Sequence, residues 1–158
     1  MTVNPETEIT VSAGATGAFQ CACMALLHPG DEVINFKPYY GNHLSTVLAV
    51  EAVPRVVSLR GPDWNLSLDD LDDTITDRTK VIVVNTPGNP SGKVFTSQEL
   101  EGIAELPQRH DLVFTDEIYE YFVYIQRKHV SFASLPDMAE RTITIPVTLK
   151  PTALPGGE

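Results

Sequence analysis

The sequence has little basic charge and no long apolar run, and each shortage excludes a class of protein. Its 158 residues include 11 Lys and Arg against 21 Asp and Glu, which gives a formal net charge of -10 at pH 7. Nucleic-acid binding needs a basic surface that contacts phosphates, so we expect no nucleic-acid partner. No apolar stretch approaches the roughly 20 residues that cross a bilayer, and the N-terminus lacks a charged segment followed by an apolar one. We therefore expect no membrane association and a cytoplasmic location.

Cysteine is also scarce, which argues against a disulfide framework. The two cysteines, Cys21 and Cys23, lie two positions apart in a segment that is predicted to be helical. Side chains at this spacing point to different sides of a helix, so we expect two reduced packing residues. Apolar residues make up 42% of the chain, which is ordinary for a globular protein. One hydrophobic core is enough for a chain of this length.

The most informative part of the sequence is a strand–helix–strand pattern in its middle. Residues 81–84 form a continuous run of β-branched side chains, which is typical of a parallel strand buried on both faces. Residues 97–104 have a polar start followed by apolar positions at helical spacing, and residues 112–114 form a second short apolar run. Other patterns predict strands over residues 8–11, 31–36, 55–59 and 142–145 and helices over residues 19–27, 43–50 and 67–73. The sequence therefore predicts an α/β protein with a mostly parallel sheet.

Polar residues follow both strands of the central unit. Asn89 comes after the first strand and Asp116 ends the second. Because parallel strands end at the same edge of a sheet, we expect Asn89 and Asp116 to lie at one edge, where ligands bind in open α/β folds. Taken alone, the Asn-Pro-Ser-Gly sequence that begins at Asn89 is typical of an ordinary turn.

A second candidate site precedes the first helix. Gly14, Ala15 and Thr16 form a turn of small residues ahead of the helix predicted over residues 19–27. Such a turn leaves backbone N–H groups and the positive end of the helix dipole facing an anion. The alternative is simple capping of the helix by the side chain of Thr16 or Ser12.

Asn89-Pro90-Ser91-Gly92, followed by Asp116-Glu117-Ile118-Tyr119, resembles the pyridoxal-phosphate-dependent aminotransferases of class I/II, within the branch of kynurenine, aspartate and methionine aminotransferases. The resemblance implies fold type I, whose large domain has three layers, α/β/α. It implies that Asn89 and Tyr119 hydrogen-bond the phenolic oxygen of the cofactor and that Asp116 pairs with its ring nitrogen. It further implies that the ring of Tyr40 stacks on the cofactor and that Gly14, Ala15 and Thr16 bind its phosphate.

Two other polar features are interpreted without a ligand. His43 is expected to be a polar residue on the face of a helix. The aspartates within residues 69–73 lack the alternating spacing and central glycine of a calcium loop, so we expect a solvated helix face and assign no metal ligand.

The last residues depart from the family pattern. Lys150 stands five positions after Ile145, at the spacing of the family's catalytic lysine, which binds the cofactor covalently and moves protons. Val147 stands where the family has serine, and Glu158 where it has arginine. Codons for these residues, read one base earlier, permit the usual family motif, so we hypothesise a frameshift near Ile145. We expect a partial cofactor-binding large domain over residues 1–145, an aberrant tail over residues 146–158, and no small C-terminal domain.

The resemblance implies a transaminase that moves an amino group from an amino acid to a 2-oxo acid and that works as a homodimer in intact relatives. Without a small domain, we expect this chain to be weakly active or inactive. Two alternatives stay open at this point: a remnant that only binds pyridoxal phosphate or dimerises, and a lyase of the same fold.

Overall fold

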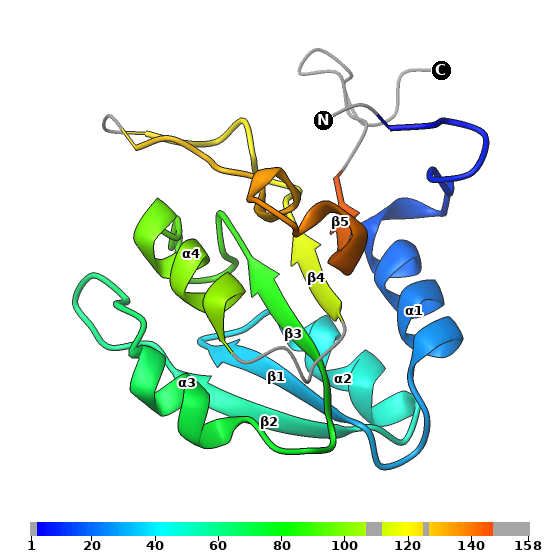
Figure 1. Ribbon diagram of the computed structural model, residues 1–158, viewed down its shortest axis with the longest axis horizontal. Coiled ribbons are helices and arrows are strands. Elements are labelled where there is room, and N and C mark those ends of the chain that lie inside the picture. Colours follow the sequence, from blue (N-terminus) through cyan, green and yellow to red (C-terminus); the bar gives the residue numbers. More distant parts are fainter. Residues whose placement is uncertain (1–2, 107–111, 125–126, 147–158) are drawn as a thin grey trace.

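A parallel five-stranded sheet forms the centre of the molecule. The computed structural model describes residues 3–106, 112–124 and 127–146. The strands lie in the order β2-β1-β3-β4-β5, and every neighbouring pair is parallel (Figure 1). Their bounds are Glu32–Lys37 for β1, Val53–Ser58 for β2, Thr79–Asn85 for β3, Leu112–Asp116 for β4 and Thr142–Ile145 for β5. The predicted parallel sheet is confirmed.

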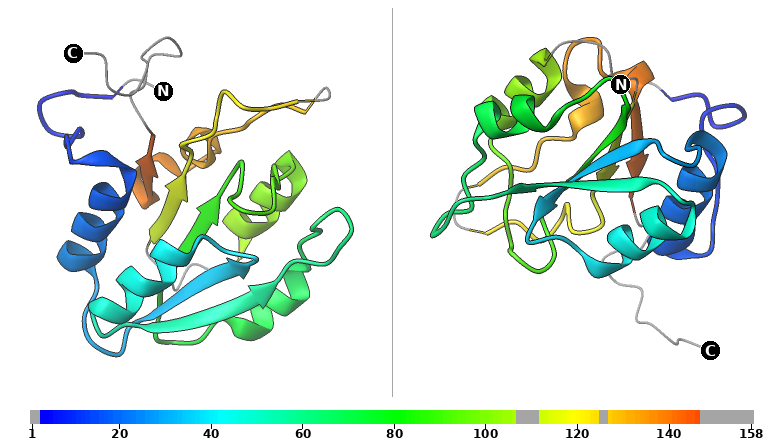
Figure 2. Two further views of the ribbon diagram at one scale, coloured as in Figure 1. Left: turned by 180° about the vertical axis from the view of Figure 1, so that it is seen from behind. Right: turned by 90° about the horizontal axis from the view of Figure 1, so that it is seen from below.

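Helices cover both faces of this sheet. One face carries α1 (Gly14–Leu26) and α2 (Gly41–Ala49), while α3 (Leu68–Thr74) and α4 (Ser97–Glu105) cover the other (Figures 1 and 2). Two short 3-10 helices, η1 (Phe132–Ser134) and η2 (Ala139–Arg141), lead into β5. The three-layer α/β/α architecture that the family resemblance implies is therefore confirmed.

The apolar run of β3 is continuous because successive side chains enter two different cores. Val81 and Val83 belong to the core under α1 and α2, whereas Ile82 and Val84 belong to the core under α3 and α4. All four side chains are at most 5% exposed. Burying a side chain of this size contributes about 1.5–3 kcal/mol, so a polar residue at any of these positions would be costly.

The connection through α4 fixes where the two central strands end. A capping box starts the helix: the Thr96 hydroxyl accepts from the Glu99 backbone N–H, and the Glu99 carboxylate accepts from the Thr96 N–H. Such boxes satisfy N–H groups that a helix start otherwise leaves unpaired. The chain then returns as β4, and Asp116 comes into register with Asn85 at the carboxyl edge of the sheet.

The structure corrects two predictions about the N-terminal part of the chain. Residues 8–11 do not form a strand; Val11 is 93% exposed and Ile9 is 55% exposed. Alternating apolar and polar residues indicate a half-buried strand only where a neighbouring strand pairs with it. Among the described residues, no strand pairs with residues 8–11. The first helix begins at Gly14, five residues earlier than predicted, so the small-residue turn is itself the first turn of α1.

The two cysteines behave differently from each other. Cys23 is fully buried, as expected of a packing residue, and burial raises the pKa of its thiol to about 12. Cys21 is exposed, so the prediction that both cysteines pack in the interior is wrong for Cys21. Both are free thiols.

Within the described part of the chain, no helix combines the length and apolar character that a membrane crossing requires. The predicted tail, with Lys150, lies outside the described residues apart from its first residue, and the frameshift hypothesis stays a prediction.

Candidate functional site

The loop after β3 and the carboxyl ends of β4 and β5 border one cavity, of about 480 Å³ when its open mouth is included. The first turn of α1 lies beside the end of β5 and closes one side of it (Figure 1). Eight residues were predicted as site residues, and six of them line this cavity: Ala15, Thr16, Tyr40, Asn89, Asp116 and Tyr119. Of the other two, Gly14 lies at the start of α1, and Lys150 is outside the described residues. The fold thus brings together residues from positions 15 to 119.

Asp116 is the buried charged group of this cavity. It is the last residue of β4, and only 6% of it is exposed. Its carbonyl accepts from the Thr86 N–H at 3.0 Å, which ties the end of β4 to the end of β3. One carboxylate oxygen, Oδ1, accepts from the Ile118 N–H at 3.3 Å, and the other, Oδ2, lies 3.1 Å from His43 Nε2. The sheet and this imidazole therefore fix the direction of the carboxylate.

His43 also lines the cavity, although the sequence reasoning did not assign it to the site. It was expected to be only a polar residue on a helix face, but it is 5% exposed and faces inward from the first turn of α2. Its ring lies 4.4 Å from the ring of Phe19 and, edge-on, 5.4 Å from the ring of Tyr40, measured between centroids. One signal could have found it. A spacing of three puts Tyr40 and His43 on one side of a helix start, so a cavity lined by Tyr40 is within reach of His43.

The start of α1 has the properties of an anion site. Ala13 is its N-cap, and within the described residues this helix start has no side-chain cap hydrogen bond. The Ser12 hydroxyl instead donates to the carbonyl of Gly14 at 3.1 Å, so the alternative of side-chain capping is not what the structure shows. An uncapped first turn presents N–H donors and the positive end of the helix dipole. Ala15 and Thr16 bring this end to the cavity wall.

Asn89 sits in a tight loop after β3. The Gly88 N–H donates to the Lys93 carbonyl at 2.8 Å, and the Gly92 N–H donates to the Gly88 carbonyl at 2.7 Å. Gly92 has a φ of 68°, in the left-handed region that side chains other than glycine adopt at a cost. The Asn-Pro-Ser-Gly sequence is therefore a turn, as its composition indicates, and the turn holds Asn89 at the cavity.

Two tyrosines form the remaining aromatic wall. Tyr40 is the N-cap residue of α2, and its hydroxyl accepts from the side-chain amide of Asn42 at 2.9 Å. Tyr119 is 37% exposed, and its ring lies edge-on to that of Phe122. Both rings line the same cavity as Asp116.

The residue after Asp116 points elsewhere and anchors the following segment. Glu117 is 2% exposed, and its Oε1 accepts from the Ser131 hydroxyl at 3.1 Å and from the Phe132 N–H at 3.3 Å. Its Oε2 lies 3.0 Å from His129 Nε2. The carboxylate of Glu120 comes close to this group, but both oxygens of Glu117 already have protein partners, so we read the cluster as structural.

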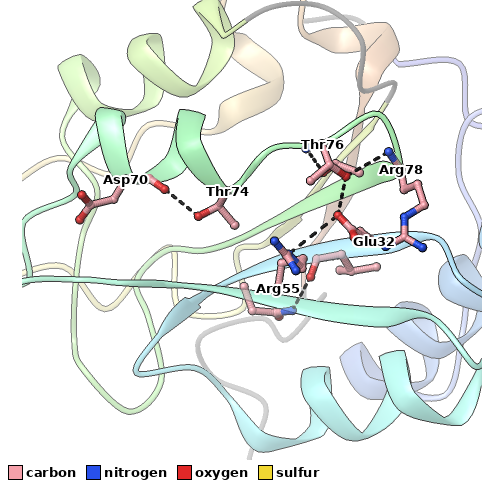
Figure 3. Close-up of polar contacts among 9 residues, drawn as sticks. Glu32, Arg55, Asp70, Thr74, Thr76 and Arg78 are labelled. Atoms are coloured by element: carbon pink, nitrogen blue, oxygen red, sulfur yellow. Dashed lines mark hydrogen bonds and ion pairs between the residues drawn. The ribbon is translucent and has the colours of Figure 1, made fainter.

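A second carboxylate is buried at the opposite edge of the sheet. Glu32, the first residue of β1, is 1% exposed and accepts from the Thr76 hydroxyl at 2.7 Å (Figure 3). Arg78 Nη2 lies 3.0 Å from its Oε1, and Arg55 Nε lies 3.9 Å from its Oε2. Both oxygens are paired, and Glu32 lines neither of the two cavities that include Tyr40 and His43.

Comparison with known proteins agrees with this geometry. Residues 1–148 match the family described as "Aminotransferase class I and II". The chain is 40% identical over 154 residues to kynurenine–oxoglutarate transaminase 3 of Rattus norvegicus, and the match covers 90% of the chain and 34% of the relative. It is 40% identical over 146 residues to a probable N-succinyldiaminopimelate aminotransferase of Mycobacterium tuberculosis, over 36% of that relative. The chain thus spans about a third of the length of the curated relatives it matches.

Solved structures share the fold. The N-succinyldiaminopimelate aminotransferase from Mycobacterium tuberculosis superimposes with a TM-score of 0.89 at 37% identity, over 92% of this chain and 39% of that one. A methionine aminotransferase from Escherichia coli, YbdL, gives a TM-score of 0.89 at 28% identity, over 94% of this chain and 39% of that one.

Proposed function

The chain belongs to the class I and II aminotransferase family, and from this premise we propose that it forms the cofactor-binding part of a pyridoxal-phosphate-dependent transaminase. The observation that carries the proposal is the composition of the cavity. A buried carboxylate, Asp116, faces the same space as an uncapped helix start and the side chains of Asn89 and Tyr119. The family is pyridoxal-phosphate-dependent, and these groups match the chemical parts of that cofactor.

The match can be followed group by group. The N–H donors at Ala15 and Thr16 suit a phosphate dianion, because a helix start is a ready-made anion site. Asp116 suits a protonated ring nitrogen, since its only ionisable partner among the described residues is His43. Asn89 and Tyr119 offer donors for an anionic phenolic oxygen, and the ring of Tyr40 can cover one face of an aromatic ligand.

The chemistry of the bound cofactor would be electron withdrawal from the α-carbon of an amino acid. Asp116 would keep a proton on the ring nitrogen, because a carboxylate beside that atom favours its charged form. His43 would hold Asp116 in direction through the 3.1 Å contact. Lys150 is proposed, by its position in the family motif, to bind the cofactor covalently and to move protons at the substrate.

The substrates of the whole protein are proposed to be an amino acid and a 2-oxo acid, and its working form a homodimer. Relatives named for kynurenine, N-succinyldiaminopimelate and methionine support an amino-group transfer without selecting one donor.

Reductive trapping tests the proposal. The protein is incubated with pyridoxal 5′-phosphate, reduced with borohydride, digested and mapped by mass. We expect one adduct at Lys150 in the parent chain and a large loss of it in Asp116→Ala. Asp70→Ala serves as the matched control, because Asp70 is an aspartate of α3 that pairs with Arg60 at the surface.

Adducts scattered over several lysines in the parent chain would contradict a built site. A specific adduct without transfer of an amino group to 2-oxoglutarate would favour the alternative of a binding remnant. Release of ammonia from the amino donor without a 2-oxo acid would favour the lyase alternative.

A further inference from the structure

A buried ion pair lies beneath the loop that carries Asn89. The Lys93 ammonium is 2.6 Å from Glu99 Oε1, and the two side chains are 4% and 14% exposed. The same ammonium lies 5.3 Å from the centroid of the Phe95 ring. Lysine is almost never buried to this degree unless it is paired, and a buried pair by itself is weak evidence for stability. Its location therefore calls for another explanation.

Backbone hydrogen bonds to Glu99 hold this ion pair in place. Besides contacting Lys93, its Oε1 accepts from the Leu66 N–H at 3.0 Å, and its Oε2 accepts from the Thr96 N–H at 2.8 Å. The helix that begins here rests on the sheet through the buried side chain of Leu100. Burial alone would raise the pKa of Glu99, but hydrogen bonds from Lys93, Thr96 and Leu66 lower it, so the carboxylate is charged at neutral pH.

Lys93 closes the loop at its other end. Its carbonyl accepts from the Gly88 N–H at 2.8 Å, and its N–H donates to the Ser91 hydroxyl at 3.2 Å. Asn89 therefore lies inside a short turn whose two ends meet at Lys93. Lys93 does not line the candidate cofactor cavity but borders a smaller cavity behind it, so it can act on that site only through the loop.

We propose that Lys93 is a positioning residue whose ion pair with Glu99 sets the loop so that Asn89 reaches the ring of the cofactor. The inference rests on the proposed function, since it concerns binding at the same cavity. Affinity for the ring then depends on a charge outside the cavity, whereas affinity for phosphate at the start of α1 does not.

The test uses pyridoxamine 5′-phosphate, which has the ring and the phosphate but forms no bond to a lysine, with affinity measured by equilibrium dialysis. A hydrogen bond to a charged oxygen is worth about a factor of ten, so Asn89→Ala and Lys93→Met are each expected to weaken binding roughly tenfold. Lys93→Met in the Asn89→Ala background is expected to weaken it no further. Lys93→Arg keeps the charge and is expected to restore most of the affinity.

Two controls separate positioning from a general effect on the fold. Inorganic phosphate, measured as a competitor, is expected to bind the parent chain and Lys93→Met equally. Arg60→Met removes a surface ion pair with Asp70 and is expected to leave both affinities unchanged. If Lys93→Met fails to fold because it leaves Glu99 unpaired, a double variant takes its place. This double variant, Lys93→Met with Glu99→Gln, removes both charges and is used in the same comparison.

Each outcome decides the question. Additive losses in the Asn89 and Lys93 double variant, or an unchanged affinity in Lys93→Met, would overturn the positioning role while leaving the proposed function standing. Absence of pyridoxamine 5′-phosphate binding by the parent chain would overturn the proposed function, and the positioning role with it.

Discussion

Glu32 at the amino edge of the sheet and Asp116 at its carboxyl edge are both buried carboxylates, but their partners differ. At the amino edge, Glu32 is paired on both oxygens, by the Thr76 hydroxyl and by Arg78. At the carboxyl edge, Asp116 has an imidazole, His43, and one backbone N–H as its partners, and it faces a cavity. A carboxylate matched by the protein's own cations is structural. One that has no lysine or arginine partner among the described residues and faces open space is suited to a cationic group of a ligand.

The largest expected effect separates ligand binding from stability at the carboxyl edge. Asp116→Asn should weaken pyridoxal 5′-phosphate binding by at least about 100-fold, because the ring nitrogen loses its anionic partner. The same change should alter the free energy of unfolding by less than about 1 kcal/mol, since binding sites commonly hold charges at the expense of stability. Equilibrium dialysis and urea denaturation measure the two quantities. If the free energy of unfolding fell by as much as the free energy of binding, Asp116 would be as structural as Glu32, and the contrast between the two edges would be lost.

The reverse pattern is expected at the amino edge. Glu32→Gln should lower the free energy of unfolding by about 2 kcal/mol, because the hydrogen bonds to Thr76 and Arg78 weaken inside a buried site. Cofactor affinity should stay the same, since no residue of this cluster lines the candidate cavity. Asp70→Asn is the matched control: its ion pair with Arg60 is exposed, and such pairs contribute at most about 1 kcal/mol. An unchanged unfolding curve for Glu32→Gln would contradict a structural role.

The sequence predicted much of the carboxyl edge because parallel strands impose it. An apolar run followed by polar residues in β3 and β4 is enough to bring Asn89 and Asp116 together, whatever their side chains do. His43 could not be predicted in the same way. A histidine in a short helix has the pattern of an exposed residue, but here His43 contacts Asp116 at the end of β4 and the ring of Phe19 in α1.

The amino edge was not predicted at all, for a related reason. Glu32 was read as the start of a strand, and its partners lie 23 to 46 positions away in β2 and in the turn before β3. Ion pairs between residues far apart in the sequence leave no periodic pattern from which they could be predicted. Residues 8–11 show the opposite failure, since their alternation is present but no strand of the described part of the chain pairs with them.

Acid should weaken the loop side of the carboxyl edge through Glu99. The pKa of Glu99 is lowered from its ordinary value of 4.5 in the folded state, although burial opposes this, because Lys93, Thr96 and Leu66 donate to it. The unfolded chain therefore binds the proton more readily. The stabilisation is present above 4.5 and is lost as the pH falls through the lowered pKa of the folded state. Unfolding free energy measured across this range should fall less steeply in Glu99→Gln than in the parent chain. Equal slopes would show that other carboxylates account for the acid sensitivity.

The smallest expected effects concern how much each partner of Glu32 contributes to stability at the amino edge. Arg78 lies 3.0 Å from Glu32 and Arg55 lies 3.9 Å from it, but their side chains are 69% and 43% exposed. Exposed guanidinium groups keep most of their hydration, so Arg78→Ala and Arg55→Ala should each lower the free energy of unfolding by only about 0.5 kcal/mol. Thr76→Val should cost more, about 1 kcal/mol, because it leaves a buried acceptor without its 2.7 Å donor.

Urea denaturation of the three variants at low and at high salt tests this order. Salt should reduce the two arginine effects and leave that of Thr76 unchanged, because screening acts on exposed charges and not on a buried hydroxyl. An arginine variant could instead show the largest loss in the free energy of unfolding, with no dependence on salt. The amino edge would then depend on ion pairs to Glu32 more than on the buried hydrogen bond from Thr76.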